Sequence, residues 1–240
     1  MAINNDCGQH AESTKFPDQV WRRKLRRQLL NWFRRNARDL PWRAAPTPYQ
    51  TWVSEIMLQQ TQVATVVEYY QRFLKRFPDI QTLATATEQE VLRYWEGLGY
   101  YRRARQLHLA AKTIMTNHHG CFPTTFPEVL ALPGIGRYTA GAILSISMGL
   151  RHPIVEANTI RLFARLLHVS TKVATVQTQT LFWEFAAWIL PHKHLSDFNQ
   201  ALMEVGSLIC TPKSPACDKC PLRTLCPTFV SQAFDKIPKP

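Results

Sequence analysis

The chain has 240 residues, of which 45% are hydrophobic, and its formal net charge is +12. This hydrophobic share supports a packed core in one large domain or two small ones and excludes wholesale disorder. The excess of basic residues favours a polyanionic partner, nucleic acid first, with an anionic membrane surface as the competing interpretation. No apolar run is long enough to cross a bilayer, and the N-terminus lacks the apolar core of a signal peptide.

In chain order, residues 1–16 are polar and aperiodic and predict a flexible arm. From Pro17 on, apolar residues recur at spacings of three and four, which predicts a helix. Its other positions are largely arginine, and they form either a solvated basic face or a DNA-contacting one. The prolines of residues 40–48 predict a loop. Further helical patterns cover residues 52–58, 63–77, 88–95, 103–117, 123–130, 138–150, 158–167, 178–190 and 196–209.

Strand signals are missing from the sequence. No segment alternates apolar and polar residues between hairpin turns, so the sequence predicts an all-α fold. We find no internal repeat or low-complexity linker, and we expect residues 227–240 to form a C-terminal tail.

Four cysteines near the C-terminus follow the pattern C-x6-C-x2-C-x5-C. Four thiolates in one loop can close a metal site, either a tetrahedral zinc or an iron–sulfur cluster. Two disulfides are the alternative, but nothing else here is typical of a secreted protein, and cytosolic cysteines at this spacing more often bind metal. The expected ligands are Cys210, Cys217, Cys220 and Cys226. The isolated Cys7 and Cys121 are expected to be incidental.

A glycine-containing turn, Leu132 to Arg137, lies between two helical patterns. Gly134 and Gly136 let the backbone turn tightly and approach a ligand closely. The next helix begins around Arg137, so its free N–H groups and positive dipole end point at the turn. This is a phosphate seat that reads a DNA backbone without base specificity, a helix–hairpin–helix signature. A plain helix C-cap is the alternative.

The hairpin and the cysteine array, in this order, resemble the endonuclease III superfamily of DNA glycosylases. Residues 52–65, with Ser54-Glu55-Ile56-Met57-Leu58-Gln59-Gln60-Thr61-Gln62-Val63, are similar to its A/G-specific adenine glycosylase (MutY-type) branch. Residues 97–101, 132–143 and 197–203 support the same assignment, and the resemblance runs from about Leu29 to Cys226.

This resemblance implies a two-lobed helix-hairpin-helix DNA glycosylase fold. A six-helix barrel lobe would cover residues 47–150, and residues 17–46 with 151–226 would form a lobe that carries a [4Fe-4S] cluster on the four cysteines. The implied enzyme is a monomeric base-excision-repair glycosylase of the bacterial cytoplasm, associated with the nucleoid. It would remove adenine mispaired with 8-oxoguanine or guanine from double-stranded DNA that contains mismatched or oxidised base pairs.

Two alternatives stay open at this point. One is a thymine glycosylase for G·T mismatches, and the other is a catalytically impaired protein that binds mismatched DNA. Full-length adenine glycosylases usually carry a further C-terminal domain that recognises 8-oxoguanine. This chain is expected to lack it, so either it discriminates mispairs more weakly or it is a truncated or naturally short form.

Cleavage of an N-glycosidic bond builds positive charge on the sugar and negative charge on the base, which calls for two carboxyl groups. Glu55 matches the family's general acid, and burial in an apolar helix would favour its protonated form. A salt-bridged structural glutamate is the alternative. Glu156 stands where the family has aspartate, and Ala157 follows where the family has glycine. We expect the site to be adjusted to the longer acid. The alternative is an enzyme that is slow or altered in substrate.

Further roles come from the resemblance alone. Tyr138 takes the place of the Schiff-base lysine of bifunctional members and so implies a monofunctional glycosylase. Gln200 and, more weakly, Arg43 would line the base pocket. Gln60, Leu98 and Tyr100 would enter or flank the opened base stack, unless they serve structural roles. The remaining DNA contacts would be Leu132, Gly134, Gly136, Arg137 and Lys213.

Overall fold

The computed structural model describes residues 15–234, and within that range every regular element is a helix. The all-α prediction is confirmed. Of the expected N-terminal arm only Lys15 and Phe16 are described, and Phe16 packs on Phe185 and Trp188 at ring distances of 5.5 and 5.4 Å. The rest of the arm, with Cys7, and residues 235–240 of the expected tail lie outside the described residues. None of the described helices combines the length and apolarity that a membrane span requires.

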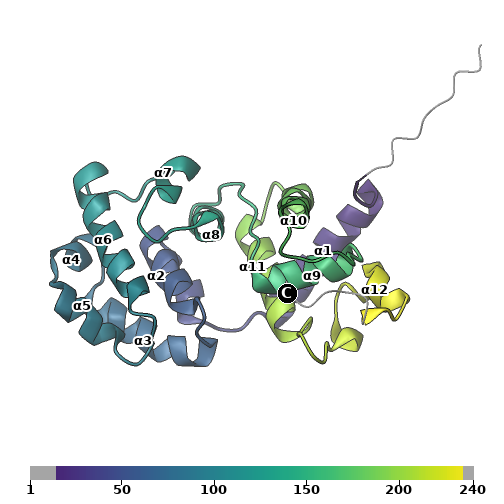
Figure 1. Ribbon diagram of the computed structural model, residues 1–240, viewed down its shortest axis with the longest axis horizontal. Helices are drawn as coiled ribbons and strands as arrows, with labels where there is room; N and C mark the ends of the chain where they lie inside the picture. Colours follow the sequence, from purple (N-terminus) through teal and green to yellow (C-terminus); the bar gives the residue numbers. More distant parts are fainter. Residues whose placement is uncertain (1–14, 235–240) are drawn as a thin grey trace, which may run out of the picture.

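The helices are joined by short connections and together form an elongated molecule (Figure 1). They are α1 (Gln19–Asn36), α2 (Pro48–Leu58), α3 (Val63–Arg76), α4 (Ile80–Thr85), α5 (Glu88–Trp95), α6 (Arg102–Asn117), α7 (Phe126–Leu130), α8 (Arg137–Ser147), α9 (Ala157–Leu166), α10 (Val176–Ile189), α11 (Leu195–Leu208) and α12 (Pro227–Val230). Short 3₁₀ helices cover Pro41–Arg43, Cys217–Lys219 and Arg223–Leu225.

Two hydrophobic cores account for the elongated shape. The first buries the apolar faces of α2 to α8 around Trp52 and Trp95 and occupies the left half of Figure 1. The second is built by α1 and by α9 to α11 around Phe163 and Phe185, on the right. Leu222 and Leu225 of the cysteine segment complete the second core.

The cores are joined where α8 packs against both α2 and α11. Asn199 on α11 donates its Nδ2 to Ser145 Oγ on α8 at 2.8 Å and to the carbonyl oxygen of His152 at 3.0 Å. At Gly141 a Cβ atom would lie 2.6 Å from the backbone oxygen of Pro153, so only glycine allows this approach. The junction fixes the start of α8 beside α2, α9 and α11.

The structure corrects two expectations about element limits. Residues 40–48 are not simply a loop, because a 3₁₀ turn covers Pro41–Arg43 and Pro48 is the first residue of α2. Proline is well placed there because the first helical N–H has no partner to lose. Thr47 and Gln50 form a capping box that starts the helix. Helix α4, which the sequence interpretation missed, begins at the N-cap Asp79.

The arginines of α1 divide between two roles. Arg26 donates to three backbone oxygens at the end of α10: to Ile189 O at 2.6 Å, Leu190 O at 2.7 Å and Trp188 O at 3.1 Å. Arg22 and Arg151 donate to the same helix end. These guanidiniums satisfy carbonyls that have no partner within the helix and complement its negative end. Arg23, Arg27, Arg34 and Arg35 are exposed.

Candidate active site

A cavity of about 480 Å³ lies at the junction of the two cores. Its walls come from α2 and the segments before and after it, from α8, from the N-terminus of α9 and from α11. The sequence-predicted residues that line it are Glu55, Tyr138, Glu156, Arg43, Gln200 and Gln60. Side chains more than a hundred positions apart in the sequence therefore meet in one concave site.

Glu55 is 6% exposed and receives a hydrogen bond at 2.6 Å from the Tyr138 hydroxyl to its Oε2. Burial raises the pKa of Glu55 to about 7, even though the bond from Tyr138 and the charge of Arg43 lower it. The nearby negative charge of Glu156 adds to the increase. Glu55 is therefore a carboxyl group that holds a proton close to neutral pH, as a general acid must.

Tyr138 stands between Glu55 and the sulfur of Met203, which lies 3.1 Å from its hydroxyl oxygen. Burial raises the pKa of Tyr138 well above its usual value, and the two carboxyl groups add to this effect. The phenol thus stays protonated, and its single hydrogen has a carboxyl acceptor and a weaker thioether acceptor within reach.

Glu156 is the N-cap of α9. Its Oε2 accepts from Asn158 N at 2.8 Å and Asn158 Nδ2 at 3.1 Å, and its Oε1 accepts from Thr159 N at 3.0 Å. Burial raises the pKa of Glu156, and these hydrogen bonds oppose the increase. All three partners are donors at the positive end of a helix, an arrangement that suits an ionised carboxylate.

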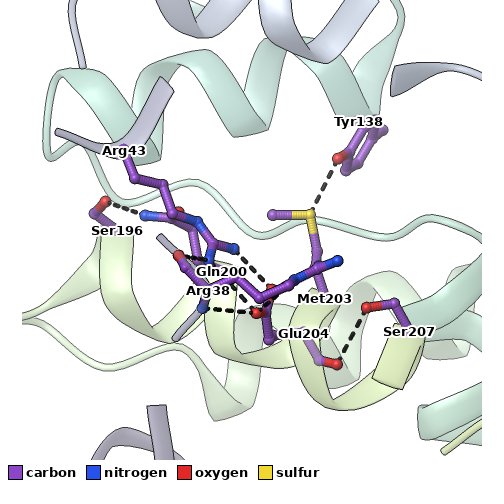
Figure 2. Close-up of polar contacts among 8 residues, drawn as sticks. All are labelled: Arg38, Arg43, Tyr138, Ser196, Gln200, Met203, Glu204 and Ser207. Atoms are coloured by element: carbon purple, nitrogen blue, oxygen red, sulfur yellow. Dashed lines mark hydrogen bonds and ion pairs between the residues drawn. The ribbon is translucent and has the colours of Figure 1, made fainter. Parts of the chain in front are cut away.

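A buried ion network, which the sequence interpretation missed, lines the same cavity (Figure 2). Glu204 on α11 is 1% exposed and accepts from Arg38 at 2.8 Å on each oxygen and from Arg43 at 2.8 Å on Oε2. Burial alone would raise the pKa of Glu204, but the two guanidiniums lower it to about 2. Arg43, a candidate base-pocket residue, is thus also the partner of a buried carboxylate. Beside it, Gln200 donates its Nε2 to Ser196 Oγ at 3.0 Å.

The predicted DNA-contacting residues differ in exposure. Tyr100 is 61% exposed, and Gln60 is exposed as well. Both line a second cavity of about 400 Å³ together with Pro133 and Gly134 of the hairpin. Leu98 and Leu132 are instead buried in the first core, so their side chains pack inside the protein.

The hairpin glycines meet different constraints. Gly134 has a φ of +75°, and a Cβ there would lie 2.6 Å from the Cβ of Gln106. Gly136 is the N-cap of α8 without a side-chain cap, and a Cβ there would have nothing within 4 Å. The first N–H groups of α8 are therefore open to a ligand. Arg137 follows with its guanidinium carbon 3.9 Å from the centre of the Trp183 ring.

The four array cysteines line one cavity, and none of the described cysteines forms a disulfide. Arg165 donates to Cys210 Sγ at 3.1 Å, and Leu222 N lies 3.4 Å from Cys220 Sγ. Burial raises the pKa values of Cys217, Cys220 and Cys226, and neighbouring thiols add to the increase. Within residues 15–234, no group of three His, Cys, Asp or Glu side chains is arranged for a single metal ion. Four cysteines around one cavity, two of them with N–H donors to their sulfurs, suit a cluster that spans the space between them. The exposed Lys213 lies in the loop between the first two cysteines.

Comparisons with known proteins agree with this geometry. Residues 53–187 match the model of the HhH-GPD superfamily base excision DNA repair proteins, and residues 210–226 match the iron–sulfur binding domain of endonuclease III. The cofactor of that segment is a [4Fe-4S] cluster.

Two curated relatives are adenine DNA glycosylases. That of Buchnera aphidicola (subspecies Baizongia pistaciae) is 42% identical over 87% of the chain and 59% of the relative, and that of Rattus norvegicus is 41% identical over 84% and 41%. The chain thus matches about three-fifths or less of these relatives. Among solved structures, a thermostable thymine-DNA glycosylase superposes with a TM-score of 0.81 and 28% identity, over 88% of this chain and 98% of that one.

The raised pKa of Glu55 predicts a pH-dependent stability difference between the wild type and Glu55→Gln. A carboxyl group that holds its proton more tightly when folded stabilises the protein below about pH 4.5 and loses that contribution as the pH rises to about 7. The free energy of unfolding of the variant relative to the wild type should therefore increase by up to about 3 kcal/mol between pH 5 and pH 8. Urea unfolding at several pH values measures it. A pH-independent difference would show that Glu55 has an ordinary pKa.

Proposed function

Because the chain belongs to the HhH-GPD superfamily of base excision DNA repair proteins, we propose that it is a monofunctional adenine DNA glycosylase. It would hydrolyse the N-glycosidic bond of adenine mispaired with 8-oxoguanine or guanine in double-stranded DNA. The observation that supports this most is the pair of unlike carboxyl groups in one cavity. Glu55 holds a proton near neutral pH, and Glu156 accepts backbone hydrogen bonds at a helix N-terminus, which favour its carboxylate form.

In the proposed reaction Glu55 donates its proton to a ring nitrogen of the extruded adenine. The bond between the base and C1′ breaks, its electron pair leaves with the base, and positive charge develops on the sugar. Glu156 stabilises that charge, and water adds to C1′ and releases a proton. Tyr138 keeps Glu55 in place through its hydrogen bond and offers no amine for a Schiff base. The product is an abasic site in an unbroken strand.

The adjusted-site hypothesis for Glu156 rests on its capping geometry. With its longer side chain, the glutamate accepts from Asn158 and Thr159 on separate oxygens, and Glu156 N donates in return to Thr159 Oγ1 at 2.8 Å. This box fixes the carboxylate at the cavity wall. The cap alone would also explain the contacts, so a test must separate capping from charge.

DNA would lie across the mouth of the cavity and bind mainly through its phosphates. The open N–H groups at Gly136 and Arg137 offer a phosphate seat, and Lys213 extends the basic surface. Gln60 and Tyr100, exposed beside that hairpin, would fill the gap left by the extruded base. We propose that the enzyme acts as a monomer on bacterial nucleoid DNA.

Cys210, Cys217, Cys220 and Cys226 are proposed as the ligands of the cluster, which organises the loop that presents Lys213. Four thiolates leave no coordination position for hydrolysis, so the cluster is not assigned to a step of the reaction. Arg165 ties this loop to α9 through the carbonyl oxygens of Thr211 and Pro212 at 2.9 and 3.2 Å.

A thymine glycosylase is the second candidate function. It is supported by the structural likeness to a thymine-DNA glycosylase, and Tyr138 fits either activity. From a different class, an inactive mismatch-binding protein would follow if Glu156 served only as a helix cap.

Single-turnover cleavage of A·8-oxoguanine, A·G and T·G duplexes, followed by alkali, separates the three functions. We expect scission of the adenine strand, only after alkali because no lyase step occurs. Cleavage at thymine would support the second candidate. Tight binding without cleavage of any duplex would support the third, and scission without alkali would contradict the monofunctional assignment.

The role of Glu156 is tested by Glu156→Asp and Glu156→Asn, two good N-cap residues of equal size that differ in charge. If the charge stabilises the sugar, the Asp variant keeps excision within about tenfold of wild type. The Asn variant then loses on the order of 100-fold or more at unchanged thermal stability. Equal single-turnover rates for the two variants would show that Glu156 is a cap and takes no part in the reaction.

A further inference from the structure

Two non-glycine residues beside the hairpin have left-handed backbone conformations. The φ of Gln60 is +57° and that of Tyr100 is +47°, and both side chains line the cavity shared with Pro133 and Gly134. Such a conformation costs a residue with a Cβ about 1–2 kcal/mol and persists only where the surroundings hold it. Something must therefore stabilise these two segments, which are forty residues apart in the sequence.

Arg103, near the start of α6, binds both segments at once. Its Nη1 donates to two of the last carbonyl oxygens of α2 and to the carbonyl oxygen of the residue before Gln60. Its Nη2 donates to the hydroxyl of the residue after Gln60 and to the carbonyl oxygens of the two residues before Tyr100. The acceptors are Ile56 O and Met57 O, both at 2.9 Å, Gln59 O, Thr61 Oγ1 at 3.1 Å, Leu98 O at 3.3 Å and Gly99 O at 3.4 Å. Four terminal N–H hydrogens are thus shared among acceptors on both sides of Gln60 and among the two carbonyls that precede Tyr100.

The same guanidinium also lies against Tyr100 itself. Its central carbon is 5.4 Å from the centre of the Tyr100 ring and 5.5 Å from that of Trp95. Trp95 donates its indole N–H to Gly99 O at 3.1 Å, and Arg103 N donates to Tyr100 O at 2.9 Å. The Arg103 side chain therefore contacts the turn that carries Tyr100 through both its backbone and its ring, and Trp95 supports the same turn.

We propose that Arg103 is a positioning residue that holds Gln60 and Tyr100 in the conformation in which they enter the duplex and keep the target base extruded. This rests on the proposed function, because it assigns Arg103 to the opening of DNA by the same site. Arg103 itself does not line the cavity that contains Glu55 and Glu156, whereas Gln60 lines both cavities, so Arg103 would act on base extrusion through Gln60 and Tyr100 and not directly on the proton donor.

The test compares Arg103→Met and Arg103→Lys with Arg105→Met. Arg105 lies on the same helix, its substitution removes the same charge, and it forms an ion pair with the exposed Glu88 at 3.0 Å. The probe is an A·8-oxoguanine duplex with 2-aminopurine next to the adenine, whose fluorescence rises when the stack opens. Arg103→Met should lower both the fluorescence increase and the single-turnover excision rate at least tenfold. The pH midpoint of excision and the affinity for undamaged duplex should stay unchanged.

Arg103→Lys should not restore extrusion, since one ammonium cannot reach acceptors on both segments, whereas Arg105→Met should match the wild type. In a Tyr100→Ala background, Arg103→Met should add no more than about twofold to the loss, because both changes remove the same wedge. Normal fluorescence in a folded Arg103→Met or Arg103→Lys protein, or fully additive losses in the double variant, would overturn the proposal. A wild-type protein that neither opens nor cleaves the duplex would instead contradict the proposed function.

Discussion

The hydrogen bond between Tyr138 and Glu55 is the contact on which the chemistry of the cavity depends. A buried carboxyl group beside a guanidinium would lose its proton, as Glu204 does with its pKa of about 2. Glu55 instead receives its hydrogen bond from a neutral phenol, while Glu204 occupies both Arg38 and Arg43. Three carboxyl groups thus share one cavity with differently shifted pKa values, raised for Glu55 and Glu156 and lowered for Glu204, because each has different partners.

The two cores matter because the cavity needs walls from both. α2 and α8 bring Glu55 and Tyr138 from the first core, and the second contributes Glu156 at the start of α9 and Glu204 on α11. The carboxylate of Glu204 also fixes the segment before α2 to α11 through Arg38 and Arg43. A change in how α8 packs on α11 would therefore move the two catalytic candidates relative to one another.

Much of the site could be predicted from the sequence, because short sequence motifs contain the residues that line it. The helical fold follows from apolar periodicity, and the motif around Glu55 and the residues Tyr138 and Glu156 do line one cavity. The sequence could not show the partners of the arginines. Glu204 occupies an ordinary polar position in a helical pattern, and Arg103 is one basic residue among many. Their roles depend on carbonyls and carboxylates from distant segments, which only tertiary packing brings together. Leu98 and Leu132 show the converse, since the motifs that contain them do not indicate that both side chains are buried.

The most direct test of this account is the protonation state of Glu55 itself. Infrared difference spectra between the wild type and Glu55→Gln, recorded as a function of pH, isolate the C=O stretch of its protonated carboxyl group. The structure predicts a band that is present at pH 6 and disappears with a midpoint near pH 7. A Glu55 that is already ionised at pH 6 would contradict the assignment of this residue as the proton donor.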